Sequence, residues 1–554
     1  MTDHLILAAL PTPNGELHLG HLGGPFLAAD ALARHLRAEG HRVTTVSATD
    51  GLESYVLDAA RREGRTPEAT ARDYHARIEA ALTATDCRPD VFLDVHDAAA
   101  AADHRSWHHA LAERLAERGR IEIRRERLLA DAATGEELVA CWLAGRCPAC
   151  GEETAGYTCE ACGMWFQPTD VREPRARHPR GHVTTTGTAS AFLRLDVPAL
   201  LDLARRRWVP EDYVDLLRRY VELNGPLWRL THPLGWGVPW TTPAPLASPD
   251  PLDPLAPLDP LARLAPRQVH STYALGTTAM FLLAGREHAR THGLPHNPLL
   301  TDGTHRPRFT LCFGLDGALP LLMQLAVQEA TGMPCAPDEY RFNRFMTLDG
   351  QKFSTGRDHV IRVLDYVAAG LDTDALRFHL ARLSPGEKPT DFSPDAFADD
   401  VTQTLAGRLS RLLDACEATA PTPNARAATA TAPVAVRHRF EDTAARHREA
   451  LRTGDLALAA AAVDDWLAFA PGAVGTAGAP RVLAVLAALA APLMPRWADL
   501  LWERLGLPAV PALAAAGRLL SSDASHLSAP APGTLPRFAP VAAAEVRALV
   551  RRSG

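Results

Sequence analysis

The chain has no excess of positive charge, few cysteines, and neither a cationic leader nor an apolar run long enough to span a membrane. In MTDHLILAAL the apolar run stops at Pro11, and no stretch is apolar enough over sufficient length to span a bilayer. The balance of 58 Lys and Arg against 65 Asp and Glu, a net charge of −7, argues against a large nucleic-acid-binding surface. Nine cysteines in 554 residues do not make a disulfide scaffold. We therefore expect a cytoplasmic enzyme with no membrane partner.

What the chain does have is enough length and apolar content for several folded units. Its 554 residues are 47% hydrophobic and 22% charged, which is typical of a globular protein of roughly two to four domains. Periodicity predicts a buried strand over 5–10, a helix that ends at Gly40, and a strand over 43–46. This order is typical of a parallel strand–helix–strand unit. The same signals predict helices over 68–84 and 99–118 and another strand over 309–316.

Three further stretches change in character. Residues 120–175 contain short strand-like pieces around a cysteine cluster and are interpreted as an inserted module. Residues 241–266 repeat Pro-Leu-Asp-Pro-Leu, a proline density that predicts a stiff linker or surface loop. From about residue 396 the chain becomes rich in alanine, leucine and arginine with helical periodicity, which predicts a helical bundle with a loop over 420–433.

The stretch PTPNGELHLGHLGGP, residues 11–25, places two histidines around a glycine directly after the first strand. A strand that turns into a helix N-terminus presents backbone N–H groups and the positive end of the helix dipole, which together suit a phosphate. His18 and His21, three residues apart, share one face of that first turn. By itself the stretch is equally typical of an ordinary glycine-rich turn with surface histidines.

A second glycine-containing loop, LDGQKFSTGRD, occupies residues 348–358. Lys352, Arg357 and two hydroxyl residues suit a triphosphate, because they neutralise charge that develops during phosphoryl chemistry. Alone, this loop is also typical of a solvated charged turn. Its occurrence together with the first motif, more than 300 residues away, makes the two informative.

Four cysteines form two close pairs, Cys147-x2-Cys150 and Cys159-x2-Cys162. This spacing supplies four thiolates for a closed, tetrahedral structural zinc site. A redox dithiol is the alternative, but two matched pairs suit a metal better. Cys141 lies outside the paired spacing.

The two loops together resemble the class I aminoacyl-tRNA synthetases, in the methionyl-tRNA synthetase branch. His18-Leu19-Gly20-His21 matches the family's His-Ile-Gly-His signature, and Lys352-Phe353-Ser354-Thr355-Gly356 stands where Lys-Met-Ser-Lys-Ser belongs. Similar stretches include RAEGHRVTTVSATD, FGLD at 313–316, TDALRFHLARLSP at 373–385 and APLMPRWADLLWERLGL at 491–507.

The resemblance implies an α/β chain with a Rossmann-like catalytic domain, an inserted zinc-binding connective module and an all-α anticodon-binding-type bundle. The expected ranges are 1–118 and 236–340 for the catalytic halves, 119–235 for the connective module, 341–395 for a stem-contact region with the KFSTG loop, and 396–554 for the bundle.

The resemblance also implies a reaction and its residues. An amino-acid carboxylate attacks the α-phosphate of ATP, supplied with Mg²⁺, and gives an aminoacyl adenylate and pyrophosphate. The implied catalytic residues are His18, His21 and Lys352, and the implied ATP contacts are Asn14, Gly20, Gly314, Asp316 and Ser354. The implied amino-acid contacts are Leu10, Thr12, Asp50 and Tyr273, with Asp50 holding the α-ammonium. For Asp50, a buried structural carboxylate is the alternative.

Several positions that surround methionine in the family differ here. Thr12 replaces a tyrosine, QVHSTYALGTT at 268–278 offers only Tyr273 for an aromatic-rich stretch, and GALPLL follows FGLD in place of Phe-His. These changes predict a substrate side chain other than methionine.

The helical bundle departs from the family as well. LAGRLSRLL at 405–413 replaces a Gly-Asn-Leu-x-Asn-Arg pattern, and APGAV at 470–474 lacks the tryptophan on which an anticodon base stacks. Trp466 lies nearby, but its helical position predicts a core residue.

The leading hypothesis is a synthetase-like enzyme of specialised metabolism that passes the acyl group to a hydroxyl or amine. TPNGELHLGHLGGP and DGLESYV resemble the synthetase-like modules of hydrazine-forming enzymes, which esterify an N-hydroxylated lysine before a cupin rearranges the product. No cupin segment is present, so such a partner would be a separate chain. The alternatives are an authentic methionine–tRNA ligase and a catalytically inactive tRNA-binding paralogue.

Overall fold

The computed structural model describes most of the chain. It leaves out residues 1, 157, 160, 241–269, 272–273, 301–302, 304, 354–358, 387, 419–430, 509, 523–526, 528–530, 532 and 551–554. The proline-rich stretch 241–266, Tyr273, Ser354 and nearly all of the loop predicted over 420–433 therefore lie outside the described residues.

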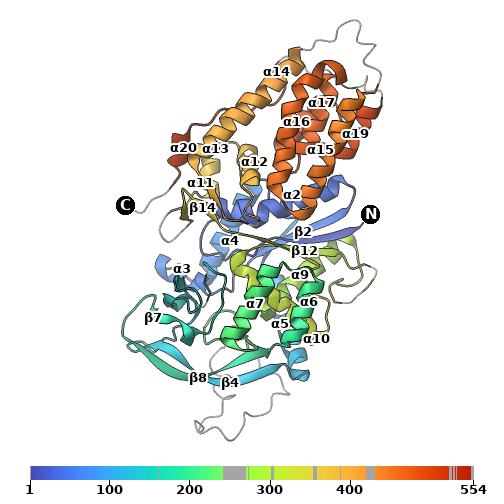
Figure 1. The fold of residues 1–554 in the computed structure, drawn as a ribbon. Coiled ribbons are helices and arrows are strands. Elements are labelled where there is room, and N and C mark those ends of the chain that lie inside the picture. Colours follow the sequence, from blue (N-terminus) through green and yellow to red (C-terminus); the bar gives the residue numbers. More distant parts are fainter. Residues whose placement is uncertain are drawn as a thin grey trace.

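A five-stranded parallel sheet divides the molecule (Figure 1). Its order is β13-β12-β1-β2-β3, with bounds Asp3–Leu7 (β1), Arg42–Thr49 (β2), Val91–Asp94 (β3), Arg308–Gly314 (β12) and Glu339–Asn343 (β13). β1 pairs with β2 on one side and with β12 on the other, so residues more than 250 positions apart in sequence become neighbours. The chain order reverses between β1 and β12, which is where open α/β sheets place their ligands, at the carboxyl ends of the strands.

The two faces of this sheet support two different cores. Ile6 and Ala8 pack with α2 (Leu27–Ala38) and the C-terminal helices, whereas Leu5 and Leu7 pack with α9 (Ala274–His292) and the insert. Successive side chains of a strand point to opposite faces, so the apolar run of β1 serves both cores. On the side of α9 lie the helices α5 (Ala98–Glu117) and α10 (Ala318–Thr331).

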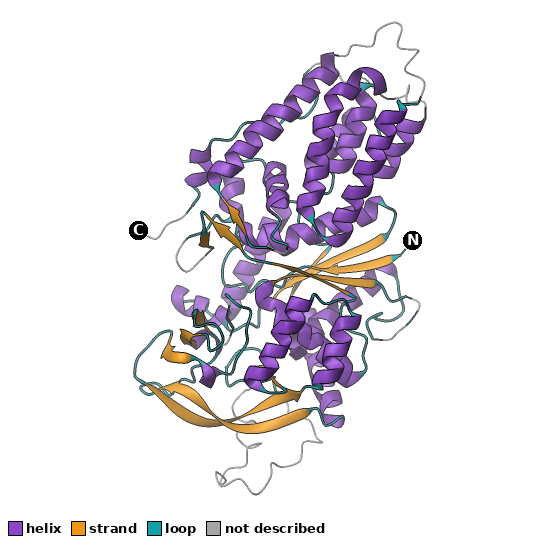
Figure 2. Ribbon diagram, in the orientation of Figure 1, coloured by secondary structure: helices purple, strands orange, loops and turns teal. Residues whose placement is uncertain are grey.

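Between β3 and β12 the chain forms an antiparallel module. β4 (Ile121–Asp131) pairs along its whole length with β8 (Val183–Arg194), and β8 continues to β9 (Leu227–Arg229). A second small sheet contains β5 (Leu143–Arg146), β6 (Glu153–Ala155) and β7 (Arg172–Ala176). Helices α6 (Val197–Arg206) and α7 (Glu211–Asn224) return the chain toward the parallel sheet. Figure 2 shows these strands at the end of the molecule opposite the helical bundle.

The C-terminal part is helical after one small sheet. β14 (Met346–Leu348) pairs with β15 (Gln351–Lys352) and β16 (Thr390–Phe392). The helices that follow β15 are α11 (Val363–Ala368), α12 (Thr373–Leu383), α13 (Pro394–Asp400), α14 (Ser410–Ala418), α15 (Val434–Thr453), α16 (Leu456–Ala477), α17 (Ala479–Ala490), α18 (Pro495–Arg504), α19 (Leu513–Ser521) and α20 (Ala543–Arg547).

By length and composition, α16 could cross a membrane, and it is the one helix in the described part of the chain that could. It packs between α15 and α17 in the bundle, and the fully buried Trp466 donates its Nε1–H to the carbonyl of Val482 at 3.1 Å. The prediction that Trp466 is a core residue is confirmed.

The predicted α/β class with a C-terminal helical bundle is confirmed, as are the strand–helix–strand opening and the helices near 68–84 and 99–118, found as α4 (Pro67–Ala84) and α5. The first strand was predicted over 5–10 but spans Asp3–Leu7. Pro11 has no N–H to continue a ladder, and the chain leaves the sheet before it to form the motif loop.

Candidate active site

The two motif histidines form one compact turn after β1. His18 caps the short helix α1 (Leu19–His21), and its Nδ1 accepts a hydrogen bond from the N–H of Gly20 at 3.1 Å. The N–H of His18 is 3.4 Å from Nδ1 of His21, and the two rings stack with centroids 3.8 Å apart. A Cβ at Gly20 would lie 3.0 Å from the His18 ring, so a larger residue would press on this ring.

These contacts determine which ring nitrogen carries the proton. Burial lowers the pKa of His21 to about 4 and that of His18 well below its ordinary value, with His21 and Lys352 adding to the effect on His18. Both rings are therefore neutral at physiological pH. Since each Nδ1 accepts a backbone N–H, each Nε2 carries the hydrogen and is a donor.

The same contacts change one expectation from the sequence. The turn was predicted to present open backbone N–H groups, yet the N–H of Leu19 donates to the carbonyl of Ile361 at 3.1 Å and that of Gly20 to His18. Two of the amides expected to be open are therefore already paired, and the imidazole Nε2–H groups are the side-chain donors that this turn presents.

The second motif loop is fixed directly against the first. His18 and Arg362 form an antiparallel bridge, and the N–H of Val363 donates to the carbonyl of Leu17 at 2.9 Å. Phe353 stacks on His18 with the rings nearly parallel at 5° and centroids 4.8 Å apart. The two motifs, separated by more than 300 residues, are therefore one site.

Lys352 reaches this site from a tight hairpin. Asp349 and Gly350, both with positive φ (47° and 73°), turn the chain from β14 into β15, which ends at Lys352. Such a two-residue turn matches the twist of a β-hairpin. The Lys352 ammonium lies 5.7 Å from the centroid of the Phe345 ring, and its charge contributes to the lowered pKa of His18.

Asp50 lies at the carboxyl end of β2, next to the turn that follows β1. Its N–H donates to the carbonyl of Pro11 at 3.0 Å, which ties the end of β2 to the loop that follows β1. Burial first, and then the nearby Glu53, raise the pKa of Asp50 well above its ordinary value. Glu53 is itself buried and accepts hydrogen bonds from the N–H (2.7 Å) and hydroxyl (2.6 Å) of Ser54. An acidic pair held this way is stabilised by a cation.

Leu10 and Asp50 line one small cavity at the ends of β1, β2 and β3. Its other walls include His104 of α5 and Met280 of α9. Thr12 is half-buried but does not belong to the lining.

The remaining predicted ATP contacts lie near the same edge of the sheet. Gly314 ends β12 beside β1, and the backbone of Asp316 lies in the short turn Leu315–Gly317 that follows. Asn14 is half-buried in the motif loop, where its N–H donates to the carbonyl of Thr12 at 2.9 Å.

The four predicted metal ligands converge in the inserted module. The sulfur atoms of Cys147, Cys150, Cys159 and Cys162 lie within 4.8 Å of one another, and Cys141 is not among them. The Cys147–Cys162 and Cys150–Cys159 sulfur pairs are 3.9 and 3.6 Å apart. Zinc–sulfur bonds of about 2.3 Å in a tetrahedron require sulfur separations of about 3.8 Å.

The two cysteine pairs adopt matching turns. In each, a glycine with positive φ follows the second cysteine, Gly151 at 82° and Gly163 at 71°, and donates to the carbonyl of the first cysteine at 2.9 and 2.8 Å. The donor set and this geometry fit zinc.

The cysteine module is connected to the Asp50 region through α3 (Tyr55–Glu63). The Tyr55 hydroxyl donates to the carbonyl of Ala155 at 2.8 Å, and the buried Asp58 carboxylate contacts Arg177 at 3.2 Å and His178 at 2.7 Å. Folding of the module therefore supports the helix that follows Asp50 and Glu53.

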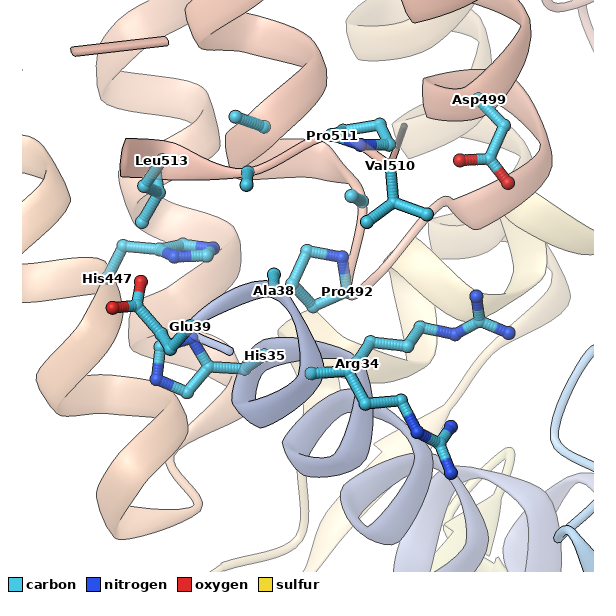
Figure 3. Close-up of a pocket in the computed structure, with 14 residues that line it drawn as sticks. Arg34, His35, Ala38, Glu39, His447, Pro492, Asp499, Val510, Pro511 and Leu513 are labelled. Carbon is cyan, nitrogen blue, oxygen red and sulfur yellow. The ribbon is translucent and has the colours of Figure 1, made fainter. Parts of the chain in front are cut away.

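A second cavity lies elsewhere, between the end of α2 and the C-terminal bundle (Figure 3). His35, Glu39 and His447 lie on one side of it, and Arg34 and Asp499 on the other. A helix of 12 residues is about 18 Å long, so this cavity is separated by the length of α2 from the loop that contains His18. It does not belong to the motif site.

Sequence reasoning found the motif residues but missed the groups that position them. Phe353 lies inside the quoted lysine motif, but nothing local indicates that it stacks on His18. The pairing of Leu17–Leu19 with Ile361–Val363 has no sequence signal, because strand pairing between distant segments depends on the whole fold.

Comparison with known proteins places these features in context. A family model described as "tRNA synthetases class I (M)" matches residues 4–244 and 322–416. The chain is 29% identical over 453 residues to the methionine–tRNA ligase of Chloroflexus aggregans, with 74% of this chain and 69% of that one covered. It is 27% identical over 414 residues to the methionine–tRNA ligase of Salinibacter ruber, with 73% of this chain and 55% of that one covered.

Among solved structures, the fold is similar to the crystal structure of Mycobacterium tuberculosis methionyl-tRNA synthetase bound by methionyl-adenylate. The TM-score is 0.71 at 18% identity, with 97% of this chain and 100% of that chain covered. The family model alone spans more than half of the present chain.

Proposed function

Because this chain belongs to the class I tRNA synthetases of the M group, we propose that it activates an amino acid as an aminoacyl adenylate and transfers the acyl group to a small-molecule hydroxyl or amine. An aminoacyl-tRNA-synthetase-like ligase is the class to which the family and its relatives belong.

The proposal rests on one observation: the loop with His18 and His21 and the loop with Lys352 meet in a single site, whose side chains donate hydrogen bonds and supply positive charge. In the proposed step, a carboxylate oxygen bonds to the α-phosphorus of ATP, the bond to pyrophosphate breaks, and no covalent enzyme intermediate forms. Such a reaction is accelerated by donors and charge already in place. The Nε2–H groups of His18 and His21 and the ammonium of Lys352 supply them, with Ser354, Asn14, Gly20, Gly314 and Asp316 as proposed ATP contacts and Mg²⁺ bound with the nucleotide.

Asp50 is the proposed partner of the substrate's α-ammonium. A carboxyl whose pKa is raised by burial and by Glu53 returns to its charged form when a cation reaches it. Leu10 borders the same cavity, and Thr12 and Tyr273 are proposed contacts as well. Thr12 in place of tyrosine supports a side chain other than methionine.

The proposed acceptor follows from whether the helical bundle has an aromatic side chain on which an anticodon base could stack. An unstacked base requires an exposed aromatic platform. At 470–474 the chain reads APGAV, and the nearest tryptophan, Trp466, is fully buried in the bundle. This supports an acceptor other than methionine tRNA. On the resemblance of TPNGELHLGHLGGP and DGLESYV to the modules of hydrazine-forming enzymes, the proposed acceptor class is an N-hydroxylated amino acid of specialised metabolism, with a cupin-type protein as a separate partner and a cytoplasmic location.

The acceptor is tested by product analysis. The protein is incubated with ATP, Mg²⁺ and an activated amino acid, together with either N-hydroxylated lysine or total tRNA, and the acylated product is identified by mass. The proposal expects the small-molecule ester or amide at a rate at least tenfold above tRNA acylation. Efficient charging of methionine tRNA would instead establish a methionine–tRNA ligase. Binding of tRNA without any acylation would indicate an inactive paralogue.

A further inference from the structure

The small cavity beside Asp50 lies where an activated amino acid would place its side chain. This step rests on the proposed function, in which Asp50 holds the α-ammonium. The cavity is lined by residues at the ends of β1, β2 and β3, which is the sheet edge that also carries the motif loop, and by residues of α5 and α9. Leu10 and Met280 give it apolar walls.

His104 closes this cavity from α5. Its Nε2 lies 3.0 Å from the carbonyl oxygen of Gly276, in the first turn of α9. A carbonyl only accepts, so Nε2 carries the hydrogen and the ring is tied to α9. Burial lowers the pKa of His104 to about 4, so this tie persists in the neutral ring at physiological pH.

The wall formed by His104 is held in place by packing. The side chain is 4% exposed, and His108, one turn later on the same face of α5, is fully buried. α5 also packs along α9, which carries both Gly276 and Met280. A close-packed interior of this kind accommodates extra atoms only at a cost of about 1–3 kcal/mol.

The free space that remains is small. The cavity has a volume of about 20 Å³. One water requires about 10–15 Å³, so the space holds one or two atoms of that size. A methyl, hydroxymethyl or mercaptomethyl group fits it, whereas the longer side chain of methionine requires the walls to move.

From this geometry we infer that His104 is a specificity-determining residue that restricts the enzyme to amino acids with short side chains, the class of glycine, alanine, serine and cysteine.

The test is an exchange assay of ATP with pyrophosphate, measured as kcat/KM for glycine, alanine, serine, valine, leucine and methionine. The variants are His104→Ala, which removes the wall and its bond to Gly276, and Met280→Ala, which enlarges the cavity from α9 without removing a polar contact. His109→Ala is the matched control, because His109 lies on the same helix but is half-buried and outside the cavity lining.

The wild type is expected to prefer a short amino acid over methionine by at least tenfold, since each methylene in a pocket changes kcat/KM by about 10–200-fold. In each enlarging variant, kcat/KM for leucine or methionine divided by kcat/KM for alanine is expected to rise at least tenfold. His109→Ala is expected to leave this ratio unchanged.

Two results would overturn the inference while leaving the proposed function intact: a wild-type preference for leucine or valine in kcat/KM, or folded His104→Ala and Met280→Ala proteins with unchanged kcat/KM ratios. Absence of exchange with every amino acid would overturn the proposed function and the inference with it. If His104→Ala fails to fold, Met280→Ala decides the outcome.

Discussion

His18 and His21 stack with ring centroids 3.8 Å apart, and the Nδ1 of each faces a backbone N–H of the same turn. This arrangement turns two weak bases into two neutral donors whose Nε2–H groups are set before any ligand arrives. The proposed chemistry therefore relies on preorganised hydrogen bonds from the imidazoles and leaves the positive charge to Lys352.

Replacing His21 with alanine should lower the rate of adenylate formation far more than it weakens ATP binding. Loss of one preorganised donor costs about 10²–10³ in kcat when the donor acts on the transition state. Single-turnover formation of the adenylate measures this, with the KM for ATP expected to change less than fivefold. His41→Ala, at the turn between α2 and β2, is the control. A rate within threefold of wild type would remove His21 from the catalytic set.

Lys352 should be protected by ATP from an amine-directed reagent. The chain has two lysines, Lys352 and the exposed Lys388, so peptide mass analysis can follow both in one sample. ATP with Mg²⁺ is expected to slow labelling of Lys352 at least fivefold and to leave Lys388 unchanged, because only Lys352 lies beside His18. Equal labelling with and without ATP would place the nucleotide away from the KFSTG loop.

The four clustered cysteines should hold one zinc ion per chain. Cys159→Ser is expected to abolish stoichiometric zinc, measured by metal analysis of the purified protein, and to lower the midpoint of thermal unfolding by several degrees. Cys141→Ser, a change at a buried cysteine outside the cluster, should retain the metal. Zinc retained by Cys159→Ser would contradict a four-thiolate site.

Loss of zinc should also reduce adenylate formation. The module contacts α3 through Tyr55 and Asp58, and α3 directly follows Asp50 and Glu53. Activity unaffected by removal of the metal would show that the module does not support the active site.

Acid should destabilise the protein between pH 6.5 and about pH 4. Burial lowers the pKa of His104 and His288 to about 4 and that of His447 to about 3, below the ordinary 6.5. In this window these imidazoles bind protons in the unfolded chain but not in the folded chain. Their contribution to the free energy of unfolding is therefore complete above pH 6.5 and decreases as the pH falls. Each such imidazole contributes a slope of about 1.4 kcal/mol per pH unit.

Urea unfolding followed by tryptophan fluorescence at several pH values measures this slope. His447→Leu is expected to flatten this slope by the contribution of one imidazole, because His447 is fully buried. A slope equal to wild type in His447→Leu would show that this ring is protonated in the folded state.

The sequence was sufficient where the signal is local. The apolar periodicity of 27–38 and the turn chemistry on either side predict β1, α2 and β2, and paired cysteines predict their own cluster. The union of His18 with Lys352 followed from the family resemblance, since no local pattern connects segments so far apart.

What could not be predicted depends on contacts between distant elements. Phe353 can stack on His18 because the backbones of His18 and Arg362 pair, which brings the two motif loops together. His104 borders the cavity because α5 packs along α9. The backbone amides of the turn were expected to be open, but Ile361 and the His18 ring accept hydrogen bonds from two of them. The bond to Ile361 depends on tertiary packing, and the bond to His18 depends on the rotamer of that ring.

The most direct test of the account is amino-acid-dependent exchange of pyrophosphate into ATP, screened across the standard and N-hydroxylated amino acids. The wild type is expected to show exchange that depends on at least one amino acid other than methionine, and Asp50→Asn to raise the KM for that amino acid by about 10–100-fold, the worth of a charge-assisted hydrogen bond. No exchange with any amino acid, or exchange with methionine alone, would contradict it.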